Sequence, residues 1–296
     1  SHPRSRGDHY LGKAAEMRYT HMKKGIALLM ALVMALALTA CTQTPPPNRG
    51  DVEGAAEPDA GYSAGDADIV QLNGFRSIHI DWTSGRVTVE LYDGQGIELS
   101  ETMMDGGDVS LKMEWRVDED DSTLDILSQP LTVSASEKKH LTVKLPRSMV
   151  LHELDINAVS ADVSVDLTEE DTLTLQELDV SSVSGTVTVH AANAEEISLS
   201  TTSGAIGGSV RTGQLEIDSV SGCVELMLDV LPAKLEAETT SGDVTLTLPA
   251  QPDVPVCIVT RTVSGQLRSE VGSTPDAANL WELETVSGSM TVSVAK

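Results

Sequence analysis

The chain alternates apolar and polar residues around a recurring four-residue phrase in which serine and glycine are the most constant members. The phrase reads TVSG, SVSG or TTSG, and from Ser160 onward its serine returns every 18 to 24 residues. Apolar residues usually stand six and four positions before the serine, and again three and five positions after it. Because alternation with a period of two is typical of strands, each repeat predicts two short strands separated by a corner.

The corner residues form the main candidate set of the sequence, and we interpret them as structural. They are Ser84, Gly85, Ser160, Ser184, Gly185, Ser203, Gly204, Ser221, Gly222, Ser241, Gly242, Ser264, Gly265, Ser287 and Gly288. Glycine is expected at a sharp corner because it adopts positive φ without a steric clash. Serine and threonine at successive corners are expected to form a hydrogen-bonded ladder.

Identical corners at similar spacing predict an all-β fold, a single-stranded parallel β-solenoid (β-helix) with short, irregular rungs. Each strand would pair in parallel with its counterpart one rung away, and Val and Ile would stack inside. Aromatic residues make up only 3% of the chain, which fits an aliphatic core. The alternative is an antiparallel sandwich, but unrelated hairpins would not need the same corner and the same inward columns eight times.

Both ends of the repeat depart from this regularity. Between Glu90 and Val150 the phrase is missing while alternation continues, so we expect irregular early rungs or a covering sheet. Phe75, Trp82 and Trp115 could plug that end. The last rung runs almost to the C-terminus and leaves little sequence for a cap, which predicts a partner or a homotypic contact at the C-terminal rung.

The segment that starts at Met22 reads MKKGIALLMALVMALALTAC, with two lysines, an apolar stretch and a terminal cysteine. This order is typical of a secretory signal peptide, and the apolar stretch is short for a membrane span. Its last four residues resemble the lipobox of bacterial lipoproteins, which implies lipidation of Cys41 and a mature chain that begins there. The alternative is a plain signal peptide or a membrane helix with an incidental cysteine.

These features divide the chain into four predicted parts. Residues 1–21 would be an extension upstream of the start, and residues 22–40 the lipoprotein signal peptide. Residues 41–68 are rich in Pro, Gly, Ala and acids and predict a disordered tether, since they cannot bury enough apolar surface to fold. Residues 69–296 would form the solenoid domain.

Charge and motifs exclude several function classes. The formal net charge of −25 disfavours nucleic acid as a partner. The chain lacks the usual nucleophile, zinc and phosphate-loop motifs, so we expect neither catalytic residues nor a metal or other cofactor. Acidic runs at 118–121 and between Asp166 and Asp171 could bind calcium, but solvated turns explain them as well. Cys223 and Cys257 occupy different columns and are predicted to be free thiols.

The stretches SIHIDWTSGRVTVELYDGQGIELSE and LTVKLPRS, followed by repeats of the corner phrase, resemble a bacterial putative-adhesin family of unknown function that includes LiaG-type envelope proteins. The resemblance covers roughly Val70 to Lys296 and implies a β-solenoid displayed at the cell envelope, without known catalytic residues.

From all of these features we expect a lipid-anchored binding module on the extracytoplasmic side of a bacterial membrane, acting as an adhesin or an envelope scaffold. Its partner would be an envelope protein, a glycan or a host surface. The alternatives are an envelope-stress sensing or signalling accessory and a polysaccharide-active β-helix enzyme.

Overall fold

A computed structural model describes residues 61–69, 76–118, 122–129, 138–168 and 173–296. The chain divides into two compact units, Ser1–Gly54 and Ala55–Lys296, and every described residue belongs to the second. The predicted signal peptide and Cys41 therefore lie outside the described residues. Within the described part, no helix is long and apolar enough to cross a membrane.

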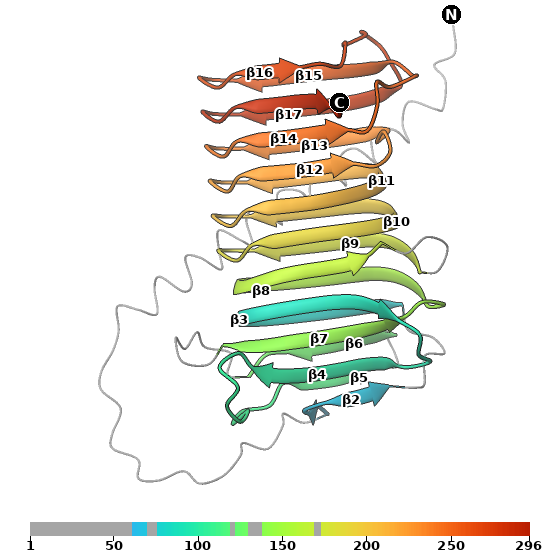
Figure 1. Ribbon diagram of the computed structural model, residues 1–296, viewed down its shortest axis with the longest axis vertical. Coiled ribbons are helices and arrows are strands. Elements are labelled where there is room, and N and C mark those ends of the chain that lie inside the picture. Colours follow the sequence, from blue (N-terminus) through green and yellow to red (C-terminus); the bar gives the residue numbers. More distant parts are fainter. Residues whose placement is uncertain (1–60, 70–75, 119–121, 130–137, 169–172) are drawn as a thin grey trace, which may run out of the picture. The chain divides into compact units, whose positions relative to one another are not determined.

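The described part consists of eighteen strands joined by turns (Figure 1). In chain order they are β1 (Ser63–Ala64), β2 (Ala67–Ile69), β3 (Ser77–Tyr92), β4 (Ile97–Met103), β5 (Glu114–Asp118), β6 (Thr123–Leu127), β7 (Lys139–Pro146), β8 (Val150–Leu167), β9 (Thr174–Ser182), β10 (Val187–Thr201), β11 (Ile206–Ser219), β12 (Val224–Leu228), β13 (Lys234–Thr239), β14 (Val244–Leu248), β15 (Val256–Thr262), β16 (Leu267–Ser269), β17 (Asn279–Thr285) and β18 (Met290–Val294).

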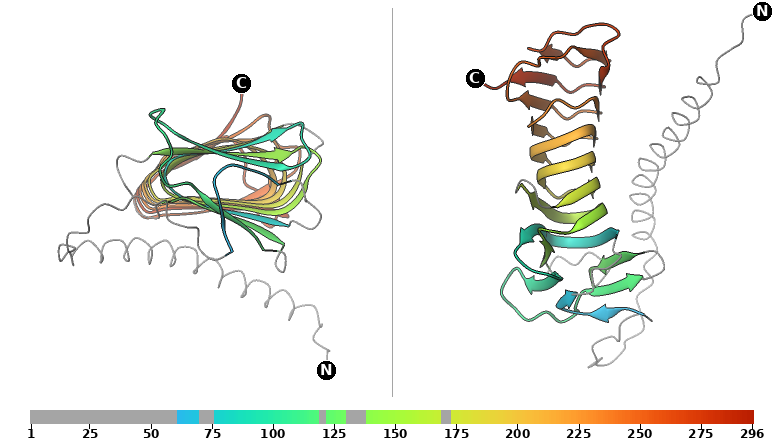
Figure 2. Two further views of the ribbon diagram at one scale, coloured as in Figure 1. Left: turned by 90° about the horizontal axis from the view of Figure 1, so that it is seen from below. Right: turned by 90° about the vertical axis from the view of Figure 1, so that its right-hand side faces the viewer.

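Successive rungs pair in parallel and in the register that the aligned corners predict. Val187 to Ala191 of β10 pair with Ile206 to Val210 of β11, and β11 pairs in turn with β12 and β13. Viewed along the stack, the rungs superpose as a flattened coil (Figure 2). The predicted β-solenoid is therefore confirmed. We call the segments before each corner the pre-corner sheet and those after it the post-corner sheet.

The core is a set of aliphatic columns that run along the stack. At the position six residues before the corner serine, Ile78, Leu154, Leu178 and Ile197 are all fully buried. Stacking of β-branched and leucine side chains from rungs about 4.8 Å apart gives each rung its hydrophobic stabilisation from its two neighbours. Every residue of the buried core lies between Ile69 and Val292, so the unit Ala55–Lys296 contains its own core.

The corner serines form a regular hydrogen-bond ladder. Seven of these hydroxyls donate to the carbonyl oxygen that precedes the corner serine of a neighbouring rung, as Ser221 does to Thr202 at 3.1 Å. The same contact, at 3.1 to 3.2 Å, is made by Ser160, Ser184, Ser203, Ser241, Ser264 and Ser287. Neighbouring rungs are thereby joined at the corner as well as along their strands.

The corner glycines are required for a reason other than the predicted one. Only Gly85 among them has a positive φ, of 105°. At the others, an added Cβ would meet the backbone of the adjacent rung: at Gly242 it would lie 1.9 Å from the carbonyl oxygen of Gly222, and at Gly222 it would lie 1.7 Å from that of Gly204. The positive-φ explanation is therefore wrong for six of the seven corner glycines, which serve the close approach of backbones instead.

The N-terminal end of the stack is closed by antiparallel strands. The rung of β6 and β7 lies on one side of β3, and β8 lies on the other. Strand β5 then pairs antiparallel with β6, and β4 pairs antiparallel with β7. The final strands, β1 and β2, are only two and three residues long. Short outer strands of this kind leave little free edge for pairing with another chain.

A buried ion pair holds this end together. The Lys139 ammonium lies 2.8 Å from the Glu101 carboxylate, and both side chains are almost fully buried. Lys139 also lies over the ring of Trp82, which is itself buried. Trp82 and Trp115 thus pack at the predicted end, whereas Phe75 lies outside the described residues. The predicted tether ends earlier than residue 68, because β1 and β2 occupy part of it.

The C-terminal end reverses the order of the rungs. Strand β17 pairs with β13 on one side and β15 on the other, and β18 likewise lies between β14 and β16. The last rung in sequence is therefore internal, and the rung of β15 and β16 ends the stack (Figure 1). The expectation of an open C-terminal rung is wrong, because both of its edges are already paired.

The sequence of the end rung fits its position. In the inward columns that hold aliphatic residues elsewhere, it carries Thr260 and Ser269, and both are exposed. The turn after β16 supplies part of a cap, since Val271 is buried and Ser273 forms a parallel bridge to Val256. Polar side chains at an end that faces water avoid the cost of exposing an aliphatic column.

Candidate functional site

The outward side of the pre-corner sheet carries rows of carboxylates, which we call the acidic face. Its residues are Glu153, Asp155, Glu177, Asp179, Glu196, Glu216, Asp218, Glu236, Glu238, Glu282 and Glu284. They arise because β8, β9, β10, β11, β13 and β17 alternate aliphatic residues inward with acidic residues outward. The post-corner sheet instead presents mainly Ser and Thr outward, such as Ser164, Thr188, Thr245 and Thr291.

Strand register places like charges directly opposite each other on this face. Asp155 pairs with Asp179 across β8 and β9, and Asp218 pairs with Glu238 across β11 and β13. Glu238 is in turn opposite Glu284. Like charges in directly opposite positions destabilise a sheet, so the fold maintains this face against its own repulsion.

Burial and mutual repulsion raise the pKa of several of these carboxyls. Desolvation by burial, followed by the charges of Asp155 and Glu177, raises the pKa of Asp179 to about 7. Desolvation, then Glu216 and Glu238, raises the pKa of Asp218 to about 7 as well. The pKa values of Glu216 and Glu238 are also raised, again mainly by burial.

Two cations offset only a part of this charge. Lys234 lies 3.5 Å from Glu236, and the guanidinium of Arg261 binds Glu284. Both contacts lie toward the C-terminal end of the face. In β8, β9 and β10 the outward column that Lys234 occupies later holds Glu153, Glu177 and Glu196. The column of Arg261 holds the neutral residues Asn157, Ser181 and Ser200 in the same strands.

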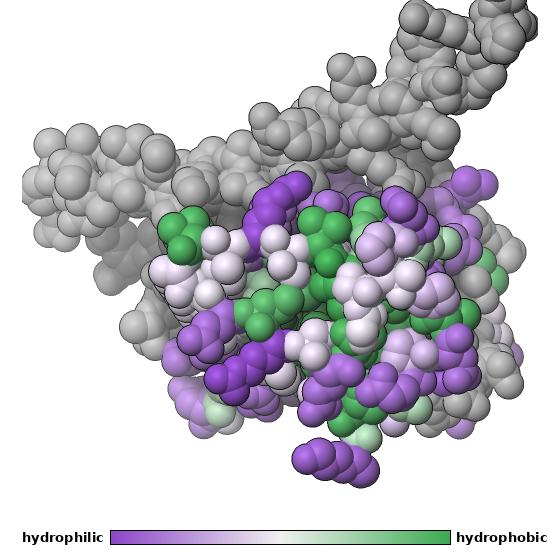
Figure 3. Space-filling model, turned by 90° about the horizontal axis from the view of Figure 1, so that it is seen from above, coloured by the Kyte–Doolittle hydropathy of each residue, from purple (hydrophilic) through white to green (hydrophobic). Residues whose placement is uncertain are grey.

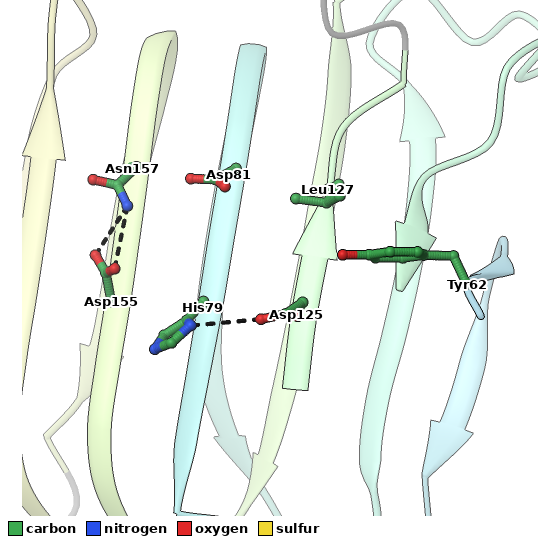
Figure 4. Close-up of a pocket in the computed structure, with 7 residues that line it drawn as sticks. All are labelled: Tyr62, His79, Asp81, Asp125, Leu127, Asp155 and Asn157. Atoms are coloured by element: carbon green, nitrogen blue, oxygen red, sulfur yellow. Dashed lines mark hydrogen bonds and ion pairs between the residues drawn. The ribbon is translucent and has the colours of Figure 1, made fainter. Parts of the chain in front are cut away.

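A polar pocket of about 260 Å³ opens at the N-terminal end of the acidic face (Figure 4). Its walls come from β3, β6 and β8 together with the chain just before β1. The lining residues are Tyr62, His79, Asp81, Asp125, Leu127, Asp155 and Asn157. Because the lining is mostly polar and acidic, the pocket suits a small ligand that donates hydrogen bonds or carries positive charge.

The imidazole of His79 is placed among the carboxylates of this pocket. Its Nδ1 lies 3.5 Å from Asp125 and its Nε2 lies 3.8 Å from Glu153. Asp125 also accepts a hydrogen bond of 2.6 Å from Arg116, whose guanidinium stacks over the Tyr62 ring. Arg116 therefore fixes both Asp125 and the aromatic wall of the pocket.

Asp155 and Asp81 are the carboxyls on the inner side of the pocket. Desolvation by burial raises the pKa of Asp155 to about 6, with His79 lowering it and Asp81 raising it further. Burial also raises the pKa of Asp81. Asn157 donates to Asp155 at 3.1 Å (Figure 4). None of the seven lining residues is a serine, threonine, cysteine or lysine.

The residues predicted from sequence lie elsewhere. The corner serines and glycines form one edge of the coil and take no part in the pocket. Of the acidic runs, Asp118 and Asp166 belong to the described part, whereas 119–121 and 169–171 lie outside it. Among the described residues, no group of three or more His, Cys, Asp or Glu could hold a metal ion. Cys223 and Cys257 are both free thiols, and Cys223 is exposed.

Sequence reasoning missed both the acidic face and the pocket. The outward columns contained the signal, because Asp or Glu stands five positions before the corner serine in five of the seven rungs from Ser160 onward, and three positions before it in three of them. His79 lies between the inward residues Ile78 and Ile80 and points outward into the pocket. Tyr62 could not have been assigned, since it reaches the pocket from a segment predicted to be tether.

Comparison with known proteins gives one family match and several structural likenesses. A comparison with curated proteins found no match. Among solved structures, a putative cell adhesion protein from Clostridium sporogenes is 14% identical, with a TM-score of 0.40 over 79% of this chain and 100% of that one. A putative adhesin from Bacteroides fragilis is 14% identical, with a TM-score of 0.43 over 80% and 99%.

A putative lipid binding protein from Parabacteroides distasonis is also 14% identical, with a TM-score of 0.41 over 80% of this chain and 98% of that one. The family model described as Toastrack DUF4097 matches residues 118–296, which is more than half of the sequence. The chain belongs to the Toastrack DUF4097 family.

Proposed function

We propose that this protein is a lipid-anchored binding module of the bacterial cell envelope, and that the acidic face is its contact surface. The anchor would be Cys41, as the lipobox-like segment indicates. The observation that carries the binding role is the in-register rows of carboxylates on β8 to β17. Repulsion between like charges is present on the pre-corner sheet and largely avoided on the post-corner sheet, which supports a binding role for the charged side.

The solenoid supports such a role in two further ways. Its outward side chains repeat at the spacing of the rungs, so a ligand with regularly spaced positive groups could contact several rungs at once. The surface is also preformed, because the aliphatic core and the corner ladder fix each strand. A preformed surface loses less entropy on binding than a flexible one.

The experiment measures retention of the purified unit Ala55–Lys296 on isolated cell envelopes and on foreign cell surfaces. At pH 8, above the pKa of about 7 of Asp179 and Asp218, a variant with Asp179→Asn, Asp218→Asn and Glu238→Gln removes negative charge from the acidic face. Its matched control carries Asp162→Asn, Asp166→Asn and Glu225→Gln, which removes three charges after the corners. We expect the first variant to lose binding and the control to retain it.

Equal binding by both variants would refute the acidic face as the contact surface. The anchor is tested separately in cells, where Cys41→Ser should release the full protein from the membrane fraction. If that variant stays with the membrane, the proposed lipid anchor is wrong, and the binding proposal stands on its own data.

A further inference from the structure

The end of the stack has one covered part and one open part. On β15, the backbone edge at Val256 to Ile258 is covered by the turn that follows β16. The Thr274 amide donates to the Val256 carbonyl at 2.8 Å, and the Ser273 hydroxyl accepts from the Ile258 amide at 2.9 Å. The rest of β15, from Thr260 to Thr262, is exposed, and β16 pairs with β18 alone among the described strands. The turn therefore covers the first half of β15, whereas the second half of β15 and the whole of β16 stay open. We call this surface, with its covered and open parts, the step.

Apolar side chains gather on this end although the positions around them are polar (Figure 3). Val263 is 81% exposed and Val254 is 50% exposed. Ile258 and Leu267 belong to the core columns but are only partly buried, since no further rung covers them. Exposed apolar side chains beside an unpaired strand edge are typical of a surface that another chain covers.

Charge at this end differs from that of the preceding rungs. Between residues 254 and 278, which form the end rung and its turn, the chain carries Arg261, Arg268, Glu270 and Asp276, a net charge of zero. Between 279 and 294 it carries only Glu282 and Glu284, a net charge of −2. Arg268 is exposed on the open part, whereas Asp276 is exposed in the turn that forms the covered part.

We propose that this end binds the same end of a second copy of the chain, so that two solenoids join across a two-fold axis. Each step then fits the other, because the covered part of one copy lies against the open part of its partner. Arg268 of each copy faces Asp276 of the second copy, which gives two equivalent ion pairs. Val263 and Leu267 are covered in the contact.

A second copy fits this surface better than side-by-side packing of two solenoids does. Lateral contact through the pre-corner sheet would bring two acidic faces together, and the energy of like charges opposes it. The zero net charge of the end rung and its turn reduces the repulsion between two acidic proteins where they meet.

The test is sedimentation velocity of the unit Ala55–Lys296 over a concentration series. We expect a monomer–dimer equilibrium. Arg268→Glu and Asp276→Arg should each weaken it at least about tenfold, because each puts like charges at both new ion pairs. An equimolar mixture of the two variants should form a heterodimer, since each swapped residue then meets an opposite charge. Val220→Asp, at an exposed corner in the middle of the stack, is the matched control and should dimerise normally.

Circular dichroism verifies that each variant is folded, and Val263→Asp provides a disruption that does not alter the turn at Asp276. The proposal is overturned if the parent unit stays monomeric at every concentration. It is equally overturned if Arg268→Glu and Val263→Asp dimerise as the parent does, or if the two charge variants fail to associate when mixed while both are folded.

Discussion

The two ends of this solenoid close the hydrophobic core against water in different ways. At the N-terminal end, antiparallel strands β4 and β5 pair with the rung of β6 and β7, and a buried ion pair joins Glu101 of β4 to Lys139 of β7. At the C-terminal end, the last rung moves inward and the end rung exchanges aliphatic residues for Thr260 and Ser269.

The difference shows that one column of the repeat does not require the same type of residue in every rung of the stack. An inward position in a middle rung is enclosed by two neighbours and must be apolar. The same position in an end rung has one neighbour and can face water. The N-terminal end covers its columns with extra strands, whereas the C-terminal end changes the residues in them.

The largest effect is expected at the buried ion pair of the N-terminal end. Lys139→Met would leave the Glu101 carboxylate buried without its cation, and should lower the free energy of unfolding by about 3–5 kcal/mol. The measurement is equilibrium unfolding in urea. The double variant Lys139→Met/Glu101→Gln should recover part of the loss, and a loss below about 1 kcal/mol in the single variant would show that the pair does not hold this end.

A pair of substitutions in one column separates the end rung from its neighbour. Leu283, in β17, is 1% exposed, and Leu283→Thr should cost about 2–4 kcal/mol because it removes buried apolar volume and buries a hydroxyl. Thr260→Leu, in the same column of β15, should change stability by less than about 0.5 kcal/mol, since that side chain is exposed. Similar losses at both sites would contradict the assigned rung order.

Two glycine substitutions compare the tightly packed corners with the cap. Gly242→Ala would place a methyl group against the Gly222 carbonyl, and should cost about 1–3 kcal/mol as the rungs move apart. Gly272→Ala meets no atom within 4 Å and should leave the thermal midpoint nearly unchanged. Thermal unfolding followed by circular dichroism measures both, and a harmless Gly242→Ala would refute close backbone approach as the reason for the corner glycines.

The smallest effect concerns the pH dependence of the acidic face. Asp179 and Asp218 have pKa values of about 7 in the folded chain, above the value of about 4 expected when it is unfolded. The folded state therefore binds more protons between these values, so the contribution of both groups to stability is greatest near pH 4 and is lost as the pH rises through 7.

Replacing both residues by asparagine should consequently stabilise the protein at pH 8 by about 1 kcal/mol, or about 2–4 °C in Tm. The difference from the parent should fall to near zero at pH 4. Glu225→Gln, an exposed substitution after a corner, is the control and should show no such trend. A double variant that is less stable than the parent at pH 8 would show that these carboxylates do not repel each other in the fold.

Much of the fold could be predicted because the position of a residue within the repeat indicates whether its side chain is buried, exposed or at a corner. The columns around Ser184 and Ser221 identified the inward side chains, the parallel register and the corners. Rung order could not be read in this way, since β15 and β17 fit the same columns and would pair equally well in either order. Thr260 and Ser269 are polar exceptions in the inward columns and belong to the end rung. They identify that rung as the end only once the order of the stack is known.

The candidate site was less predictable than the fold. Asp155, Asp179 and Asp218 were visible as outward acids, yet their raised pKa values depend on burial by neighbouring rungs. The pocket joins His79 and Asp81 to Asp125 and Asp155, which lie on separate rungs, and to Tyr62 from the far side of the N-terminal end. Such a combination follows from the irregular strands that the repeat does not describe.

The reversed rung order is the claim on which the comparison of the two ends depends, and disulfide trapping tests it most directly. In the unit Ala55–Lys296 with Cys223 and Cys257 replaced by serine, cysteines are introduced at Glu238 and Glu284, or at Glu238 and Arg261. Residues in register on adjacent rungs lie about 5 Å apart, within disulfide range, whereas residues two rungs apart do not. Since Glu238 is in register with Glu284, and Arg261 is one rung further, we predict rapid oxidation of the first pair alone. Oxidation of the second pair in place of the first would show that the rungs follow the order of the sequence, and would contradict this account.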